Sequence, residues 1–131
     1  MDDVLSAWQD KVAAHLIAWS LSRHVHVEYA ETGAGVAQCR IRITLTDGSL
    51  LQCVERVRAT SGCLITEKYS FHWQDPAGAL ISRWDNAPHH RELSGFPHHV
   101  HVADENQVQA HAPVNVFIIT DLIEARTTPT A

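Results

Sequence analysis

The spacing of apolar residues predicts a helix at the start of the chain. Apolar residues recur at intervals of three and four: Val4, Leu5, Trp8, Val12, Leu16 and Trp19. This spacing is typical of an amphipathic helix that lays one side on a sheet. Asp2 and Asp3 favour the helix N-terminus as capping residues and through their charge.

Alternation of apolar and polar residues then predicts a series of strands. It is clearest at residues 39–45, where Cys39, Ile41, Ile43 and Leu45 alternate with polar residues. Turn sequences such as Asp47-Gly48 separate the segments. We therefore predict an antiparallel meander of about five strands with one face covered by helix. The predicted strands span residues 24–29, 39–45, 50–58, 64–74 and 79–84.

The alternation ends at Trp84, and a loop region follows. Proline and glycine at residues 86–88 and 94–97 indicate loops around His89-His90-Arg91. Val100 and Val102 favour a short edge strand with His99 and His101 on its other face. We expect residues 103–112 to be polar and loose.

Pro113 opens a C-terminal segment for which we predict a helix, although the β-branched residues of 114–119 leave a strand possible. Its apolar residues have helical spacing: Val114, Phe117, Ile118, Leu122 and Ile123. The prediction is a single α+β domain over residues 1–131, with an N-terminal helix, a meander sheet, a histidine-rich loop region and a C-terminal helix.

Composition narrows the function classes. The chain has 131 residues, 45% hydrophobic and 19% charged, which is typical of one globular domain. The net charge of −5 argues against a broad nucleic-acid footprint but allows a local site. No apolar run approaches the roughly 20 residues that span a bilayer. The chain starts with acidic residues rather than a signal-like segment, so we expect no membrane contact.

The three cysteines, Cys39, Cys53 and Cys63, show no C-x-x-C spacing. We interpret them as small buried hydrophobic residues of a protein in a reducing compartment. The cytoplasm is therefore the expected location. An exposed sheet edge makes a homodimer possible.

Residues 69–101 hold six of the ten histidines. Imidazole titrates near neutral pH and is a common metal ligand, so this block is where we expect chemistry. No nucleotide-binding loop and no G-x-S-x-G nucleophile motif is present. The remaining histidines, for which we expect structural roles, are His15, His24, His26 and His111.

The order of three motifs within residues 39–101 resembles the TumE family of prokaryotic toxins. The motifs are His72-Trp73-Gln74-Asp75, Asp85-Asn86-Ala87-Pro88-His89-His90 and Phe96-Pro97-His98-His99-Val100-His101. The resemblance implies a growth-inhibiting toxin paired with a small cognate antitoxin protein. It implies no particular catalytic residues.

We predict a metal-independent ribonuclease, the commonest activity of such toxins, with no cofactor. His89 or His90 and His99 or His101 would be the general acid and base. Arg83 or Arg91 would hold the phosphate, Asp85 would orient an imidazole, and Tyr69 or Trp84 would stack on a base. Further candidates for substrate binding in the same motifs are His72, Asn86 and His98.

Three alternatives remain. His99 and His101, two residues apart on a strand, point the same way and with His89, His90 or Asp85 could ligate a metal for a hydrolase. No H-E-x-x-H motif supports this site. The block could instead be a non-enzymatic surface that binds protein or nucleic acid. A purely structural role for the histidines is the third alternative.

Overall fold

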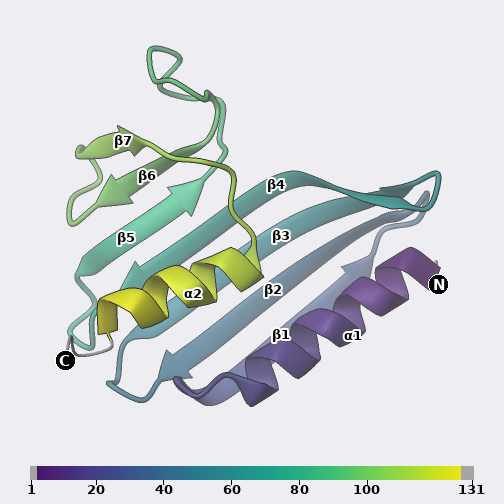
Figure 1. Ribbon diagram of the computed structural model, residues 1–131, viewed down its shortest axis with the longest axis horizontal. Coiled ribbons are helices and arrows are strands. Elements are labelled where there is room, and N and C mark those ends of the chain that lie inside the picture. The colour runs from purple at the N-terminus through teal and green to yellow at the C-terminus, as the bar shows by residue number, and fades with distance from the viewer. Residues whose placement is uncertain (1–2, 128–131) are drawn as a thin grey trace.

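Seven strands form one antiparallel sheet in chain order, β1 to β7, and two helices lie against one of its faces (Figure 1). The computed structural model describes residues 3–127. The helices are α1 (Asp3–Ala18) and α2 (Val116–Thr127). The strands are β1 (Ser22–Glu31), β2 (Val36–Leu45), β3 (Leu50–Thr60), β4 (Cys63–Gln74), β5 (Leu80–Asp85), β6 (His99–Val102) and β7 (Val108–Ala110).

The α+β meander is confirmed, but the sheet has seven strands rather than about five. The short β6 is the predicted edge strand, and it is not at the edge because β7 pairs with it. Strand β7 lies in the segment expected to be loose. Its three residues are held by backbone pairing alone, which needs no alternation of apolar side chains and so leaves no sequence pattern.

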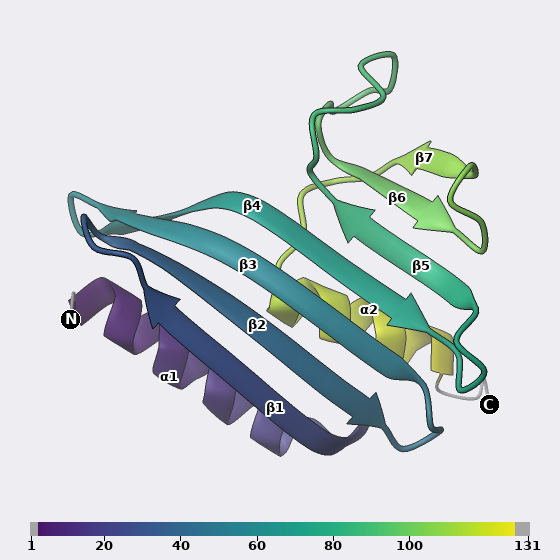
Figure 2. The same cartoon turned by 180° about the vertical axis from the view of Figure 1, so that it is seen from behind.

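The helix-covered face of the sheet carries the hydrophobic core. Helix α1 buries Leu5, Trp8, Val12 and Leu16 of the predicted stripe, whereas Val4 is half-buried and Trp19 lies after the end of the helix. Beneath it, Ile43, Leu51 and Phe71 are also fully buried on β2, β3 and β4. Figures 1 and 2 show both helices on this side of the sheet, so the apolar half of each alternating strand is removed from water.

Helix α2 confirms the predicted C-terminal helix but presents a different stripe to the core. Asn115 caps it, accepting a hydrogen bond from the Ile118 backbone N–H at 2.9 Å. Ile118 is 41% exposed, whereas Ile119 and Ile123 are fully buried. The segment is apolar nearly all round, so periodicity alone could not show which side faces inward.

The opposite, open face of the sheet is polar and carries most of the basic residues. Figure 2 views this face, with both helices behind it. Alternation with the core positions places on it six of the ten Lys and Arg residues: Arg40, Arg42, Arg56, Arg58, Lys68 and Arg83. Glu67, at a register shift in β4, pairs with Arg56 at 3.2 Å and with Arg58.

The cysteines only partly follow the expectation. Cys39 and Cys53 are buried in the core, and Cys63 is exposed, which corrects the prediction for that residue. Cys63 begins β4 directly after the turn at residues 61–62, where its neighbours Gly62 and Leu64 are also exposed. Burial, followed by the charge of Glu55, raises the pKa of Cys39 to about 11. Within residues 3–127, no helix has the length and apolar character needed to cross a membrane.

Candidate functional site

The hairpin of β5 and β6 places four polar side chains together on the open face. Arg83 pairs with His101 across the two strands, and Asp85 pairs with His99. Because side chains alternate along a strand, all four point the same way. Trp84, between Arg83 and Asp85 on β5, points to the opposite face and is buried in the core.

Asp85 is the centre of this group and is only 6% exposed. Its Oδ1 lies 3.0 Å from Nε2 of His99, and its Oδ2 lies 3.5 Å from Nε2 of His101. Arg83 donates from Nε to Oδ2 at 3.1 Å, and the Ala87 backbone N–H donates to Oδ1 at 3.0 Å. The buried carboxylate therefore faces two imidazoles and one guanidinium.

The other ring nitrogen of each imidazole is fixed by a backbone carbonyl. Nδ1 of His99 lies 2.8 Å from the Pro97 oxygen, and Nδ1 of His101 lies 2.9 Å from the Glu105 oxygen. A carbonyl only accepts, so both Nδ1 atoms carry the proton. In the neutral ring, the lone pair of each Nε2 then points toward Asp85.

Nε2 of His101 has a donor, because an Arg83 amino group lies 3.1 Å away. Nε2 of His99 faces a carboxylate oxygen instead, and two lone pairs at 3.0 Å repel each other. A cation between these two atoms, either a proton or a metal ion, turns that repulsion into attraction.

A third imidazole, His90, approaches from the loop between β5 and β6. Its ring centroid lies 5.2 Å from that of His99 and 5.8 Å from that of His101. His90 has a φ of 60°, a left-handed conformation that is uncommon for a side-chain-bearing residue. This backbone departs from the extended one in which His89 and His90 would face opposite sides.

These side chains line a pocket of about 590 Å³ that opens to solvent. We call it the polar pocket, defined by its lining residues Lys68, Tyr69, Ser70, Arg83, Asp85, Ala87, His89, His90, His99, His101, Glu105 and Asn106. Every residue predicted to be catalytic lines it, and His89, which is exposed, contributes to its rim.

Sequence reasoning missed two charged residues of the polar pocket. Lys68 lies on the open face of β4, and the pairing register of β4 with β5 brings that face beside Asp85. Glu105 follows β6, in the segment expected to be loose, and its carboxylate lies 2.7 Å from Arg83. The alternation of apolar and polar residues along β4 could have indicated that Lys68 lies on the same face as Asp85. Nothing in the sequence indicated that Glu105 belongs to the pocket.

The predicted stacking residues are not available to a base. Trp84 is 4% and Tyr69 is 2% exposed, so the expectation that their rings form a stacking surface is corrected. Burial raises the pKa of Tyr69 to about 12. The Tyr69 hydroxyl instead bonds Nδ1 of His98 at 2.9 Å, and the two rings stack. His98 lines a separate cavity beside α2 rather than the polar pocket.

The remaining predicted binding residues lie outside the polar pocket. Asn86 joins the end of β5 to β4, accepting from the Tyr69 backbone N–H at 2.9 Å and donating to the Glu67 carbonyl. Arg91 lies over the Phe96 ring in the exposed loop. His72 pairs with Arg83 on the open face, and burial, assisted by that cation, lowers its pKa.

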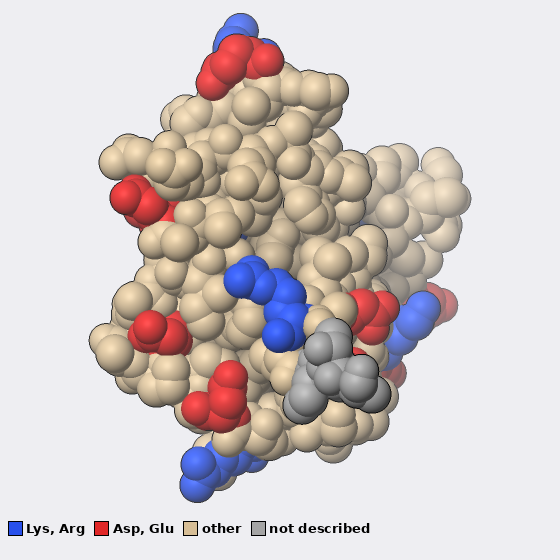
Figure 3. Space-filling view, turned by 60° about the vertical axis from the view of Figure 1, so that its left-hand side comes forward, with Lys and Arg blue, Asp and Glu red and all other residues tan. Residues whose placement is uncertain are grey.

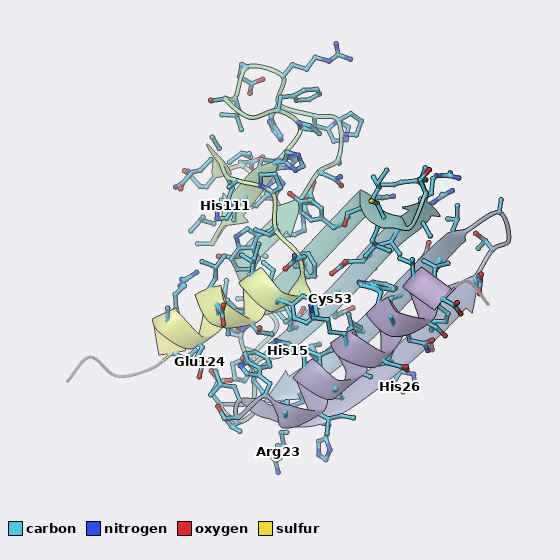
Figure 4. The ribbon with its side chains drawn as sticks, turned by 45° about the vertical axis from the view of Figure 1, so that its right-hand side comes forward. His15, Arg23, His26, Cys53, His111 and Glu124 are labelled. Carbon is cyan, nitrogen blue, oxygen red and sulfur yellow. The ribbon has the colours of Figure 1, made fainter. Side chains whose placement is uncertain are left out.

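Of the four histidines outside the block, His24 and His26 lie on β1, and His15, His26 and His111 lie apart from one another (Figure 4). His15 joins the two helices through a 2.7 Å hydrogen bond to Thr120. His26 lies on β1, at the opposite end of the sheet from His111. Figure 3 shows one end of the molecule, where basic and acidic groups are interspersed without a broad area of one sign.

Comparison with known proteins gives one match. The sequence profile of the family described as "Toxin TumE" matches residues 13–127, well beyond the three motifs of residues 72–101. No curated protein and no solved structure matches the chain.

Proposed function

We propose that this chain, which belongs to the TumE toxin family, inhibits growth by cleaving RNA at the polar pocket. The observation that carries the proposal is the convergence of three imidazoles and a buried carboxylate in a solvent-open pocket of about 590 Å³. Two basic residues, Lys68 and Arg83, line the same pocket. RNA cleavage needs proton transfer beside a cation that stabilises the charged phosphorane.

The two basic residues would have different parts in holding the phosphate. Arg83 is already engaged by Asp85 and by Glu105, at 3.1 and 2.7 Å, so much of its charge is compensated. Lys68 is exposed at the pocket wall, on the neighbouring strand. We assign Lys68 to the substrate phosphate and Arg83 to the orientation of Asp85.

The imidazoles also differ in what they can reach. His99 is 2% exposed and has both ring nitrogens facing acceptors, so we treat it as a positioning residue. His90 is half-buried and lines the polar pocket, and Nε2 of His101, unlike that of His99, has a donor, the Arg83 amino group at 3.1 Å. These two imidazoles either transfer protons themselves, as the sequence led us to expect, or ligate a metal ion that activates water.

The open face offers a path for the substrate strand. Arg40 and Arg42 lie exposed on β2 and extend the basic surface beyond Lys68, whereas Arg56 on β3, between them and Lys68, is paired with Glu67 at 3.2 Å. Such a row suits the regularly spaced phosphates of a single strand. The net charge of −5 restricts this attraction to the one face.

Membership of a toxin family supports a protein partner as well. We propose that a cognate antitoxin binds this chain and blocks the polar pocket or the open face. An acidic antitoxin segment would complement the arginines of the open face.

The test is cleavage of total RNA by purified protein, with and without chelator, beside the His90→Ala and Asp85→Asn variants. We expect cleavage by the native chain and a loss of about a hundredfold or more in both variants. His24→Ala, an exposed histidine on β1, is the control and should cleave normally.

The outcome also separates the alternatives. RNA bound without cleavage would overturn the enzymatic proposal and favour a binding module. Cleavage that persists undiminished in both folded variants would place the reaction elsewhere on the molecule. Circular dichroism of each variant verifies the fold.

A further inference from the structure

We propose that His90, His99, His101 and Asp85 form a binding site for one divalent transition-metal ion. The sequence favoured a metal-independent reaction and left a histidine-ligated metal site as an alternative, and the geometry of the polar pocket is the reason for now preferring the metal site. The proposal goes beyond RNA cleavage and does not depend on it, because it concerns only the ligand atoms of this chain.

The first argument is orientation. Nδ1 of His99 and Nδ1 of His101 are both held by backbone carbonyls, at 2.8 and 2.9 Å. A hydrogen bond from one ring nitrogen to a carbonyl is how proteins fix the tautomer and direction of a metal-ligating histidine. Here it aims two Nε2 lone pairs at one carboxylate, and all three side chains are buried.

The second argument is distance. Two ligand atoms about 2.0–2.1 Å from a shared tetrahedral ion are about 3.3 Å apart. The Asp85 oxygens lie 3.0 Å from Nε2 of His99 and 3.5 Å from Nε2 of His101. The distance from Oδ1 of Asp85 to Nε2 of His99 is close to the value expected between neighbouring ligands, so these two ligand atoms are already near their bound spacing.

The third argument is the additional imidazole. One ring nitrogen from each of His90, His99 and His101 lies within 4.8 Å of the other two. Metal binding requires these atoms to close further, and His90, half-buried on a loop, is the ligand with room to do so. A proton shared by His99 and Asp85 would account for that pair alone and would give no reason for His90 to approach.

Arg83 is the competitor for this position. Its amino group lies 3.1 Å from Nε2 of His101, and a metal ion would displace that one contact. Arg83 would keep its bonds to Oδ2 of Asp85 and to Glu105, leaving Oδ1 and the three imidazoles for the ion. The guanidinium would then orient the ligating carboxylate from outside the coordination sphere.

The ligand chemistry selects the class of ion. Three imidazoles and one carboxylate suit Zn²⁺, Co²⁺, Ni²⁺ and Fe²⁺, whereas Mg²⁺ and Ca²⁺ prefer oxygen ligands. The pocket opens to solvent, so an ion that accepts a fifth ligand would also bind water or a substrate oxygen.

The experiment uses untagged full chain, freed of metal by a chelator, and titrated separately with Zn²⁺ and Mg²⁺ in a calorimeter. We expect one Zn²⁺ per chain, with micromolar or tighter affinity, and no comparable Mg²⁺ binding. Titration with Co²⁺ should give visible absorption bands typical of nitrogen and oxygen ligands. Zn²⁺ and Co²⁺ that bind only weakly, or at several sites of equal strength, would overturn the proposal.

Single substitutions locate the ion. His90→Ala should weaken Zn²⁺ binding about tenfold or more, and His99→Ala and His101→Ala should weaken it further. His89→Ala is the matched control, because it removes the adjacent, exposed histidine and should leave affinity unchanged. Equal losses in the His89 and His90 variants would contradict the assignment. His90 is loop-borne, so this comparison holds even where a buried variant fails to fold.

The two proposals can fail separately. Zn²⁺ binding without RNA cleavage would retain the metal site and reject the ribonuclease. Cleavage by metal-free protein that binds no Zn²⁺ or Co²⁺ would reject the metal site and retain proton transfer by the imidazoles.

Discussion

The long-strand half of the sheet and its short-strand half are built for different purposes. Strands β1 to β4 have 10 to 12 residues each, and the core lies against them. Strands β5, β6 and β7 have 6, 4 and 3 residues, and β5 and β6 hold the buried polar group around Asp85. The contrast indicates that apolar burial on the long strands stabilises the fold while the short strands hold a costly polar arrangement.

The sharpest way to break this contrast is to remove a core side chain from the long half. Phe71 is fully buried on β4, so Phe71→Ala should lower the free energy of unfolding by about 3–5 kcal/mol. His90→Ala, in the loop of the short half, should change it by no more than about 0.5 kcal/mol. Urea denaturation of both variants makes the comparison, and a His90 variant as unstable as the Phe71 variant would refute it.

Glu55 is the exception in the long half, because it is a carboxylate 3% exposed in the core. Burial raises its pKa to about 7, against the opposing effect of a hydrogen bond from the Val116 backbone N–H. The Glu55 carboxyl therefore holds its proton more tightly in the folded state than in the unfolded state, where its pKa has the ordinary value of 4.5. Its contribution to stability is greatest below pH 4.5 and is lost as pH rises to about 7.

The variant Glu55→Gln should remove this pH dependence while keeping an oxygen for the Val116 N–H. We expect the variant to gain on the native chain as pH rises from about 4.5 to 7, by a difference on the order of 3 kcal/mol. Thermal or urea unfolding at several pH values measures the difference. A constant difference across that range would show that Glu55 titrates normally in the fold.

The open face of the long strands should matter least for stability, because its exposed side chains serve binding rather than folding. Arg42→Ala should change the free energy of unfolding by no more than about 0.5 kcal/mol. If RNA follows this face, the salt dependence of its binding should fall by about 0.7 in slope for one lost phosphate contact. Lys11→Ala, on the helix-covered side, is the matched control. An unchanged slope in the Arg42 variant would remove this face from the RNA path.

Much of the fold could be predicted because each element leaves a local pattern. The stripe on α1 and the strict alternation of residues 39–45 report burial directly, and the structure agrees with both. The failures occurred where local pattern is silent. Strand β7 is held by backbone pairing, and α2 is apolar on too many sides for its orientation to be read.

The sequence indicated which residues form the site, but not how they are arranged in space. Histidine density identified the block, and two-residue spacing placed His99 and His101 on one face. The approach of Lys68 depends on strand register, and that of His90 depends on a left-handed backbone. Both are properties of the assembled chain, which is also why buried Trp84 was mistaken for an exposed ring.

The alternation of side chains along β6 makes this strand intolerant of insertions and deletions during evolution. Inserting one residue between His99 and His101 would place these two imidazoles on opposite faces of the sheet. A single such event would abolish the ligand set. Length variation among relatives should therefore be absent from β6 itself.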